Sequence, residues 1–223
     1  MHGKLGILFL HHTRNDVTLH NLELIRQRHP GAVVATMSAN EPLQDGYTLN
    51  NTPSLKRLHS QLPQRREDSL VCSWFLQKKE QCDKWWIVEW DVFCEVSVFD
   101  YYKSVWNYPF VASTVCLRYR DLHWYWFQKL DGTPEEYVPY IIGALPFLFL
   151  LSEPALEATC RMLLDHPFTS ANSEVRFATA ANRSGYAPCG FSPPNDRMIC
   201  QPWKRLEGPP AIFHPVKHHV DYR

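Results

Sequence analysis

The chain has 223 residues, of which 45% are hydrophobic, and its 23 basic side chains are balanced by 23 acidic ones. This length and composition predict an ordered protein that buries a sizeable core, and we expect one domain over residues 1–223. Because the formal net charge is zero, no overall field attracts nucleic acid or an anionic membrane. An anionic ligand therefore needs a local site.

The cysteines and the apolar runs indicate where the protein works. The seven cysteines are an odd number and none belongs to a Cys-x-x-Cys pair, which favours free thiols in a reducing cytoplasm. The apolar stretch at 5–10 is too short for a secretory signal, and the longest apolar run, 138–151, is interrupted by proline and glycine. We therefore expect a cytoplasmic protein without a transmembrane segment.

The first forty residues predict a strand, a helix and a second strand. Residues 5–11 are nearly all apolar, which is typical of a strand buried on both faces of a parallel sheet. Asp16 is expected to cap a helix over 17–28, and a second apolar strand follows over 32–37. This βαβ order predicts an α/β fold with a mostly parallel, twisted central sheet flanked by helices on both faces.

After residue 37 the sequence predicts a long loop, several helices and four more strands. Residues 38–64 are rich in Asn, Pro, Ser and Gly, which predicts a long loop with one short helix. Asp68 is expected to cap the helix that follows this loop. Further helices are predicted over 69–81, 96–106, 154–166 and 173–183, and further strands within 85–93, over 110–117, at 198–201 and at 211–214.

The segment 85–93 is a predicted core strand that ends in two acids, Glu89 and Asp91. Their spacing of two places both carboxylates on one face of the strand. Buried carboxylates are costly unless a cation meets them, and open α/β sheets bind ligands at the carboxyl ends of strands. The pair therefore favours an Mg²⁺ or Mn²⁺ site that also takes phosphate oxygens. The alternative is an exposed strand end whose acids face water or a lysine.

The sequence Ile-Val-Glu-Trp-Asp at 87–91 resembles the Asp-x-Asp signature of GT-A glycosyltransferases, in a Glu-x-Asp form. The order of elements over most of the chain is also similar to that family. The resemblance implies a GT-A-like fold in which Asp91 binds the metal and Glu89 assists it or contacts the ribose. It further implies a hexosyltransferase that moves a sugar from a nucleoside-diphosphate donor, such as a UDP-sugar, to a hydroxyl acceptor such as a glycan, with Mn²⁺ or Mg²⁺.

A late histidine adds to this pattern. The stretch Ile-Phe-His-Pro-Val-Lys at 212–217 predicts a short strand that is followed by His214 and Lys217. Imidazole can complete a metal shell, and an ammonium group can neutralise a diphosphate. Similar His-Pro-x-Lys stretches in GT-A-like families imply that His214 coordinates the metal. The alternative is a solvated tail whose histidines have no role.

The loop after the first strand is the second candidate binding segment. The resemblance implies that this loop holds the nucleotide, which points to His12, Thr13 and Arg14 as binding residues. A loop between a strand and a helix is well placed for this, because helix N-termini attract phosphate. The alternative is that the polar residues Asn15 and Asp16 only cap the helix.

Glu174 is the candidate catalytic base. The resemblance to inverting GT-A enzymes implies an acid at the start of a late helix, and a carboxylate within hydrogen-bond reach of the acceptor hydroxyl can remove its proton. The alternative is ordinary capping, because Ser173 followed by Glu174 is a common start of a helix.

Two other functions remain open at this stage. The acids and histidines also suit a metal-dependent phosphoesterase or nucleotide hydrolase, and the aromatic residues 124–127 suit a non-enzymatic sugar-binding module. We expect most of that aromatic segment to be core. No Walker A, Gly-x-Gly-x-x-Gly or Gly-x-Ser-x-Gly motif is present, which disfavours P-loop chemistry, hydride transfer and serine hydrolysis.

Overall fold

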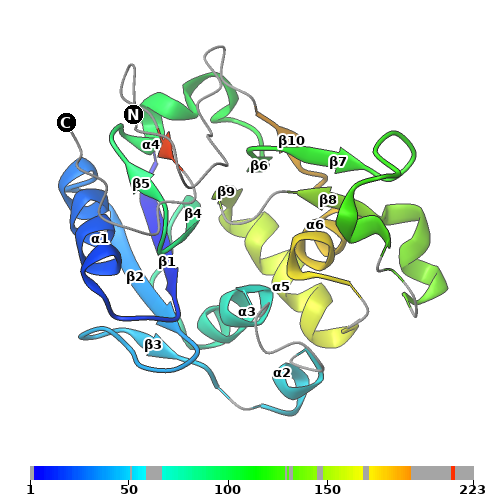
Figure 1. Ribbon diagram of the computed structural model, residues 1–223, viewed down its shortest axis with the longest axis horizontal. Coiled ribbons are helices and arrows are strands. Elements are labelled where there is room, and N and C mark those ends of the chain that lie inside the picture. Colours follow the sequence, from blue (N-terminus) through cyan, green and yellow to red (C-terminus); the bar gives the residue numbers. More distant parts are fainter. Residues whose placement is uncertain are drawn as a thin grey trace.

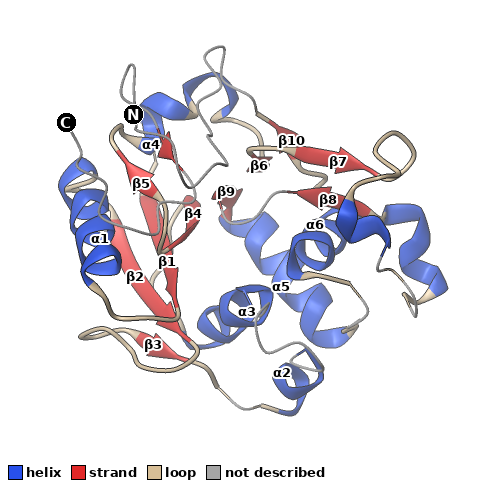
Figure 2. Ribbon diagram, in the orientation of Figure 1, coloured by secondary structure: helices blue, strands red, loops and turns tan. Residues whose placement is uncertain are grey.

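The computed structural model has a seven-stranded sheet with helices packed on both of its faces, as Figures 1 and 2 show. Helices of the described part are too short or too polar to span a membrane. The described residues are 3–50, 52–58, 67–128, 130, 133–144, 148–167, 171–191 and 212–213.

The strand order in the sheet is β10-β6-β9-β4-β1-β2-β3. Neighbouring strands are parallel except around β9, which runs antiparallel to both β4 and β6. The predicted mostly parallel sheet is therefore confirmed. The strands are β1 (Leu5–His11), β2 (Val33–Ser38), β3 (Tyr47–Thr48), β4 (Lys84–Glu89), β6 (Phe110–Ala112), β9 (Leu148–Ser152) and β10 (Cys189–Gly190).

Two smaller antiparallel pairs flank this sheet. The first joins β5 (Phe93–Cys94) to β11 (Ile212–Phe213), and the second joins β7 (Val115–Leu117) to β8 (Ile142–Ala144). The strand predicted at 211–214 is confirmed at its two described residues, whereas the strand predicted at 198–201 lies outside the described residues.

Helices divide between the two faces because successive residues of a strand point to opposite sides. Trp85 and Ile87 of β4 join the core formed with α2, α3, α5 and α6, whereas Trp86 and Val88 join the core formed with α1 and α4. The helices are α1 (Asp16–Arg28), α2 (Pro53–Leu58), α3 (Glu67–Gln77), α4 (Val98–Tyr101), α5 (Glu153–Asp165) and α6 (Ser173–Arg183), with 3₁₀ turns η1 (Lys103–Val105), η2 (Tyr125–Gln128) and η3 (Glu135–Tyr140).

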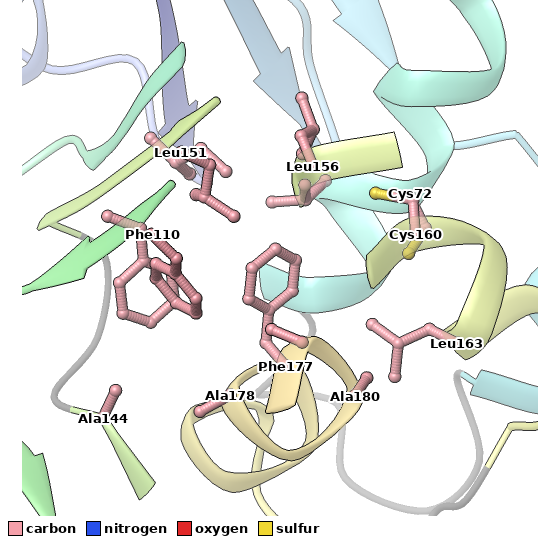
Figure 3. Close-up of a cluster of buried hydrophobic side chains, with 14 of the residues drawn as sticks. Cys72, Phe110, Ala144, Leu151, Leu156, Cys160, Leu163, Phe177, Ala178 and Ala180 are labelled. Atoms are coloured by element: carbon pink, nitrogen blue, oxygen red, sulfur yellow. The ribbon is translucent and has the colours of Figure 1, made fainter. Parts of the chain in front are cut away.

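The core that includes α6 depends on aromatic packing. Figure 3 shows Phe177 of α6 pointing toward Phe110, Leu151 and Leu156. The ring of Phe177 stacks on Phe149 with centroids 5.5 Å apart and meets Phe110 edge to face at 6.3 Å. This packing anchors α6 to the sheet and so sets where its first turn lies.

The predicted caps of two helices are wrong. α1 begins at Asp16, but its N-cap is Asn15, whose side-chain oxygen accepts the backbone N–H of Thr18 at 2.9 Å. Asn15 has the extended backbone that an N-cap needs, so Asp16 falls into the first turn. α3 begins at Glu67 instead of residue 69 and ends at Gln77 instead of 81, and Asp68 also lies in its first turn. The carboxylate of Asp68 is taken by Arg176.

Two other predicted elements are divided. The helix expected over 96–106 is only α4 and η1, because tertiary contacts take over: the hydroxyl of Tyr102 donates to the carbonyl of Leu148. The strand expected over 110–117 becomes β6 in the main sheet and β7 in a separate pair, with Ser113 in the bend between them. Local propensity predicts neither break, because both depend on partners distant in sequence.

His29 links the end of α1 to the start of α4. Its Nδ1 lies 2.7 Å from the carbonyl of Ile25, and its Nε2 accepts the backbone N–H of Val98 at 2.8 Å. Both contacts are hydrogen bonds only in the neutral ring with a proton on Nδ1. Burial lowers the pKa of His29, which also favours the neutral form.

This contact predicts a pH-dependent contribution to stability. Because the pKa of His29 is lower in the folded protein, the unfolded chain takes up the proton first as the pH falls. The contribution is complete above the unfolded pKa of about 6.5 and declines as the pH falls through that value toward the folded pKa. The stability advantage of the wild type over His29→Gln should therefore shrink between pH 8 and pH 5 in urea denaturation. A stability difference that stays constant between pH 8 and pH 5 would contradict this prediction.

Candidate active site

The carboxyl ends of β1 and β4 lie side by side at one edge of the sheet. Glu89, the last residue of β4, is in register with Leu10 of β1 and is half-buried. β4 ends at Glu89, so Asp91 lies in the turn after the strand, and the prediction that both acids share one face of the strand is wrong. In this turn the N–H of Val92 donates to the carbonyl of Glu89 at 3.2 Å, and Asp91 is only 4% exposed. The predicted acids therefore lie where parallel sheets bind ligands. The alternative of a fully exposed strand end does not hold for Asp91.

The loop after β1 packs against the acidic segment. The ring of His12 meets the indole of Trp90 edge to face, with centroids 5.1 Å apart. The side-chain amide of Asn21 in α1 donates to the carbonyl of Trp90 at 3.0 Å, which fixes the turn between the two acids. Thr13 is half-buried and Arg14 is exposed. The structure thus brings His12 to Trp90, the residue between the two acids in the sequence.

His11 is a polar residue at this edge that the sequence analysis did not select. It ends β1 and is 2% exposed, and its Nδ1 lies 3.3 Å from the carbonyl of Thr13. Within the described part of the chain, its buried Nε2 has no hydrogen-bond partner. Burial lowers the pKa of His11, so the neutral ring can present an acceptor lone pair at Nε2. The sequence feature that could have indicated His11 is its position as the last residue of the predicted strand 5–11.

The strand pair β5–β11 brings Ile212 and Phe213 close to the acidic segment. Phe213 is in register with Phe93, two residues after Asp91, and Ile212 is in register with Cys94. The residue that follows Phe213 in the sequence is His214. His214 and Lys217 themselves lie outside the described residues. The structure therefore pairs the strand that precedes His214 with the strand that follows Asp91.

The start of α3 adds Glu67, which the sequence analysis missed. The pKa of the Glu67 carboxyl is raised to about 7, first because the group is buried and second because it faces the negative charge of Glu89. Glu67 thus lies near enough to Glu89 for the charge of Glu89 to act on it. No local signal could reveal this, because its hydrogen-bond partner Ser173 is 106 residues away in sequence.

The start of α6 lies against the start of α3. The hydroxyl oxygen of Ser173 is 2.7 Å from Oε2 of Glu67, and the side-chain amide of Asn172 donates to Oε2 of Glu174 at 2.8 Å. Glu174 is 9% exposed. Asn172 is the N-cap residue of α6 but makes no side-chain capping bond. The structure therefore connects Glu174 to Glu67 through contacts that ordinary capping does not require.

A buried ion pair locks these two helices together. Arg176 of α6 donates from Nε to Oδ2 of Asp68 at 2.7 Å and from a terminal nitrogen to Oδ1 at 2.8 Å. Asp68 is 0% and Arg176 5% exposed. A two-pronged contact of this kind fixes both distance and orientation. The pair thus holds the first turns of α3 and α6 in one arrangement.

The donor chemistry of the acidic edge suits a divalent cation. Among the described residues, no group of three or more His, Cys, Asp or Glu side chains is arranged to hold a metal. Glu89 and Asp91 nevertheless offer carboxylate oxygens at a strand end, and Mg²⁺ is commonly held by one or two carboxylates together with substrate phosphates. The two acids therefore fit a metal that shares its coordination with a diphosphate.

The aromatic segment is largely structural. Trp124 and Phe127 meet edge to face at 4.9 Å, and Trp124 fills the space beside Gly143, where an added Cβ would lie 1.9 Å from the indole. Trp126 is partly buried against the same core, whereas Tyr125 is 51% exposed. The expectation that most of this segment is core is confirmed.

Comparisons with known proteins assign no family. No protein-family model and no curated protein match the sequence. The galactosyltransferase LgtC, crystallised with donor and acceptor sugar analogues, aligns at 10% identity and a TM-score of 0.42 over 83% of this chain and 72% of that one. An active-site mutant of LgtC aligns at 11% identity and a TM-score of 0.45 over 95% of this chain and 87% of that one. These values transfer no property of LgtC to this protein, and the α/β fold class rests on the sheet described above.

Proposed function

We propose that the protein is a metal-dependent glycosyltransferase that moves a sugar from a nucleoside diphosphate, such as UDP, to a hydroxyl acceptor such as a glycan. The pairing of β5 with β11 carries this proposal. It places the strand leading to His214 beside the strand leaving Asp91, two segments more than one hundred residues apart that the Glu-x-Asp resemblance assigns to one metal.

In this proposal Asp91, Glu89 and His214 hold Mn²⁺ or Mg²⁺. Two carboxylates and an imidazole are ligands that Mn²⁺ accepts. When bound, the metal neutralises the diphosphate and stabilises it as the leaving group. Lys217 follows His214 by three residues and supplies a further positive charge to the diphosphate.

The loop after β1 binds the nucleoside in this proposal. The ring of His12 meets Trp90 edge to face, and Trp90 lies between the two acids in the sequence. A base or ribose held by His12, Thr13 and Arg14 would therefore lie next to the acidic pair. These contacts orient the donor and exclude water from one side of it.

Glu174 takes the proton of the acceptor hydroxyl as the new glycosidic bond forms. The donation from Asn172 to Oε2 of Glu174 stabilises the ionised carboxylate and fixes its direction. A base in a fixed direction and in the ionised state is what proton removal from a hydroxyl requires.

Tryptophan fluorescence tests this proposal, because Trp90 lies between Glu89 and Asp91. Titration with UDP and GDP in the presence of MnCl₂ should change the emission, and chelation of the metal by EDTA should reverse the change. Trp90→Phe should lose most of the signal, whereas Trp106→Phe, remote in sequence on the β5–β6 connection, should keep it. No response to either nucleotide would refute nucleotide binding.

Catalysis is tested by nucleotide release from UDP-glucose, UDP-galactose and UDP-N-acetylglucosamine, with maltose, cellobiose and lactose as acceptor probes. Release that increases with an acceptor and requires Mn²⁺ or Mg²⁺ supports sugar transfer. Metal-dependent cleavage of bis(p-nitrophenyl) phosphate that exceeds transfer to every acceptor would favour a phosphoesterase instead.

A further inference from the structure

We propose that Glu67 is a positioning residue, whose carboxyl group acts through Ser173 and Asn172 to hold the carboxylate of Glu174 in its working direction. The inference rests on the proposed function, because it gives Glu174 the role of base. It adds a residue from α3 to a reaction that the sequence assigned to β4, α6 and the end of the chain.

Side-chain contacts connect Glu67 to Glu174 without a gap. Oε2 of Glu67 lies 2.7 Å from Oγ of Ser173, Oγ lies 3.1 Å from Oδ1 of Asn172, and Nδ2 of Asn172 donates to Oε2 of Glu174 at 2.8 Å. The four side chains form an unbroken series from α3 to α6. Two of these contacts join oxygen atoms and one joins nitrogen to oxygen, and all three are within hydrogen-bond reach.

The number of protons in this series determines which groups donate. A serine hydroxyl carries one proton, yet Oγ of Ser173 lies close to two acceptor oxygens. With the amide of Asn172 directed at Glu174, every contact is a hydrogen bond only when Ser173 donates to Asn172 and a protonated Glu67 donates to Ser173.

The series takes the side chain of Asn172 away from the capping role that its position predicts. An N-cap asparagine normally accepts a backbone N–H of its own helix, and loss of such a cap destabilises the helix. Asn172 makes no such bond and uses both ends of its amide in the series instead. The buried pair of Asp68 and Arg176 then fixes the register between the two helices. Helix capping gives no reason for this arrangement, whereas orientation of Glu174 does.

The test compares three variants of the full-length protein in the nucleotide-release assay. Glu67→Ala and Ser173→Ala each break the series, and kcat should fall about 10- to 100-fold, the usual loss when the support of an active group is removed. The donor KM and the affinity for UDP in fluorescence should not change. Glu67→Gln keeps a neutral donor at position 67 and should restore kcat to near the wild-type level.

Controls separate positioning from folding. Glu23→Ala removes an exposed carboxylate from α1 and should leave kcat unchanged. Thermal melting reports whether each variant is folded, and Ser173→Ala provides a smaller change if Glu67→Ala does not fold.

Two outcomes would overturn the proposal while leaving the proposed function intact. Wild-type kcat in both folded alanine variants would show that the series has no role. A loss in Glu67→Gln as large as that in Glu67→Ala would show that Glu67 acts as a carboxylate. In contrast, absence of nucleotide binding and sugar transfer in the wild type would refute the proposed function itself.

Discussion

Replacement of Asp91 by Asn is expected to lower kcat for sugar transfer about 1000-fold, which corresponds to about 4 kcal/mol in the activation free energy. Asp91 is 4% exposed at the carboxyl end of the acidic segment, so the amide keeps the shape of the side chain but removes the charge that attracts the metal. Fluorescence titrations should also show that nucleotide binding by the variant no longer increases with MnCl₂.

Asp100→Asn provides the matched control for this prediction. Asp100 is an exposed acid on α4, so the substitution removes the same charge from the protein without touching the acidic edge. Its kcat and its dependence on Mn²⁺ should equal those of the wild type. Retention of Mn²⁺-dependent binding and transfer by Asp91→Asn would contradict the metal site.

Replacement of Asp68 by Ala is expected to lower the free energy of unfolding by about 3–5 kcal/mol, as measured by urea denaturation. The substitution leaves the guanidinium of Arg176 buried without its carboxylate partner, and both residues are at most 5% exposed. The loss is large because the buried guanidinium loses the two-pronged ion pair that offsets its desolvation cost.

An exposed ion pair gives the comparison. Arg161 contacts Glu157 one turn away on α5, and both side chains are largely exposed, so Glu157→Ala should cost below about 0.5 kcal/mol. The double variant Asp68→Leu/Arg176→Met should recover much of the loss, because it removes both buried charges. A cost for Asp68→Ala no larger than that for Glu157→Ala would show that the pair does not hold α3 against α6.

The candidate site could be predicted from the sequence only where its residues are adjacent in the chain. The apolar run before Glu89 predicts an acid at a strand end, because burial of a strand is a local property, whereas the expected strand alternation fails for Asp91, which lies in the turn after β4. Glu67 was missed because its partners come from β4 and α6. The sequence predicts a capping role for Asp68 because Asp is a preferred residue at a helix start, whereas its actual partner Arg176 is 108 residues away.

The α/β class, the opening βαβ unit and the strand end at Glu89 could be predicted from the sequence alone, since these follow from apolar periodicity over short distances. Tertiary contacts set which strand runs antiparallel, where the predicted strand at 110–117 divides, and how the starts of α3 and α6 meet. Those features depend on hydrogen bonds and buried charges between segments distant in sequence, and such contacts leave no mark in the periodicity of either segment.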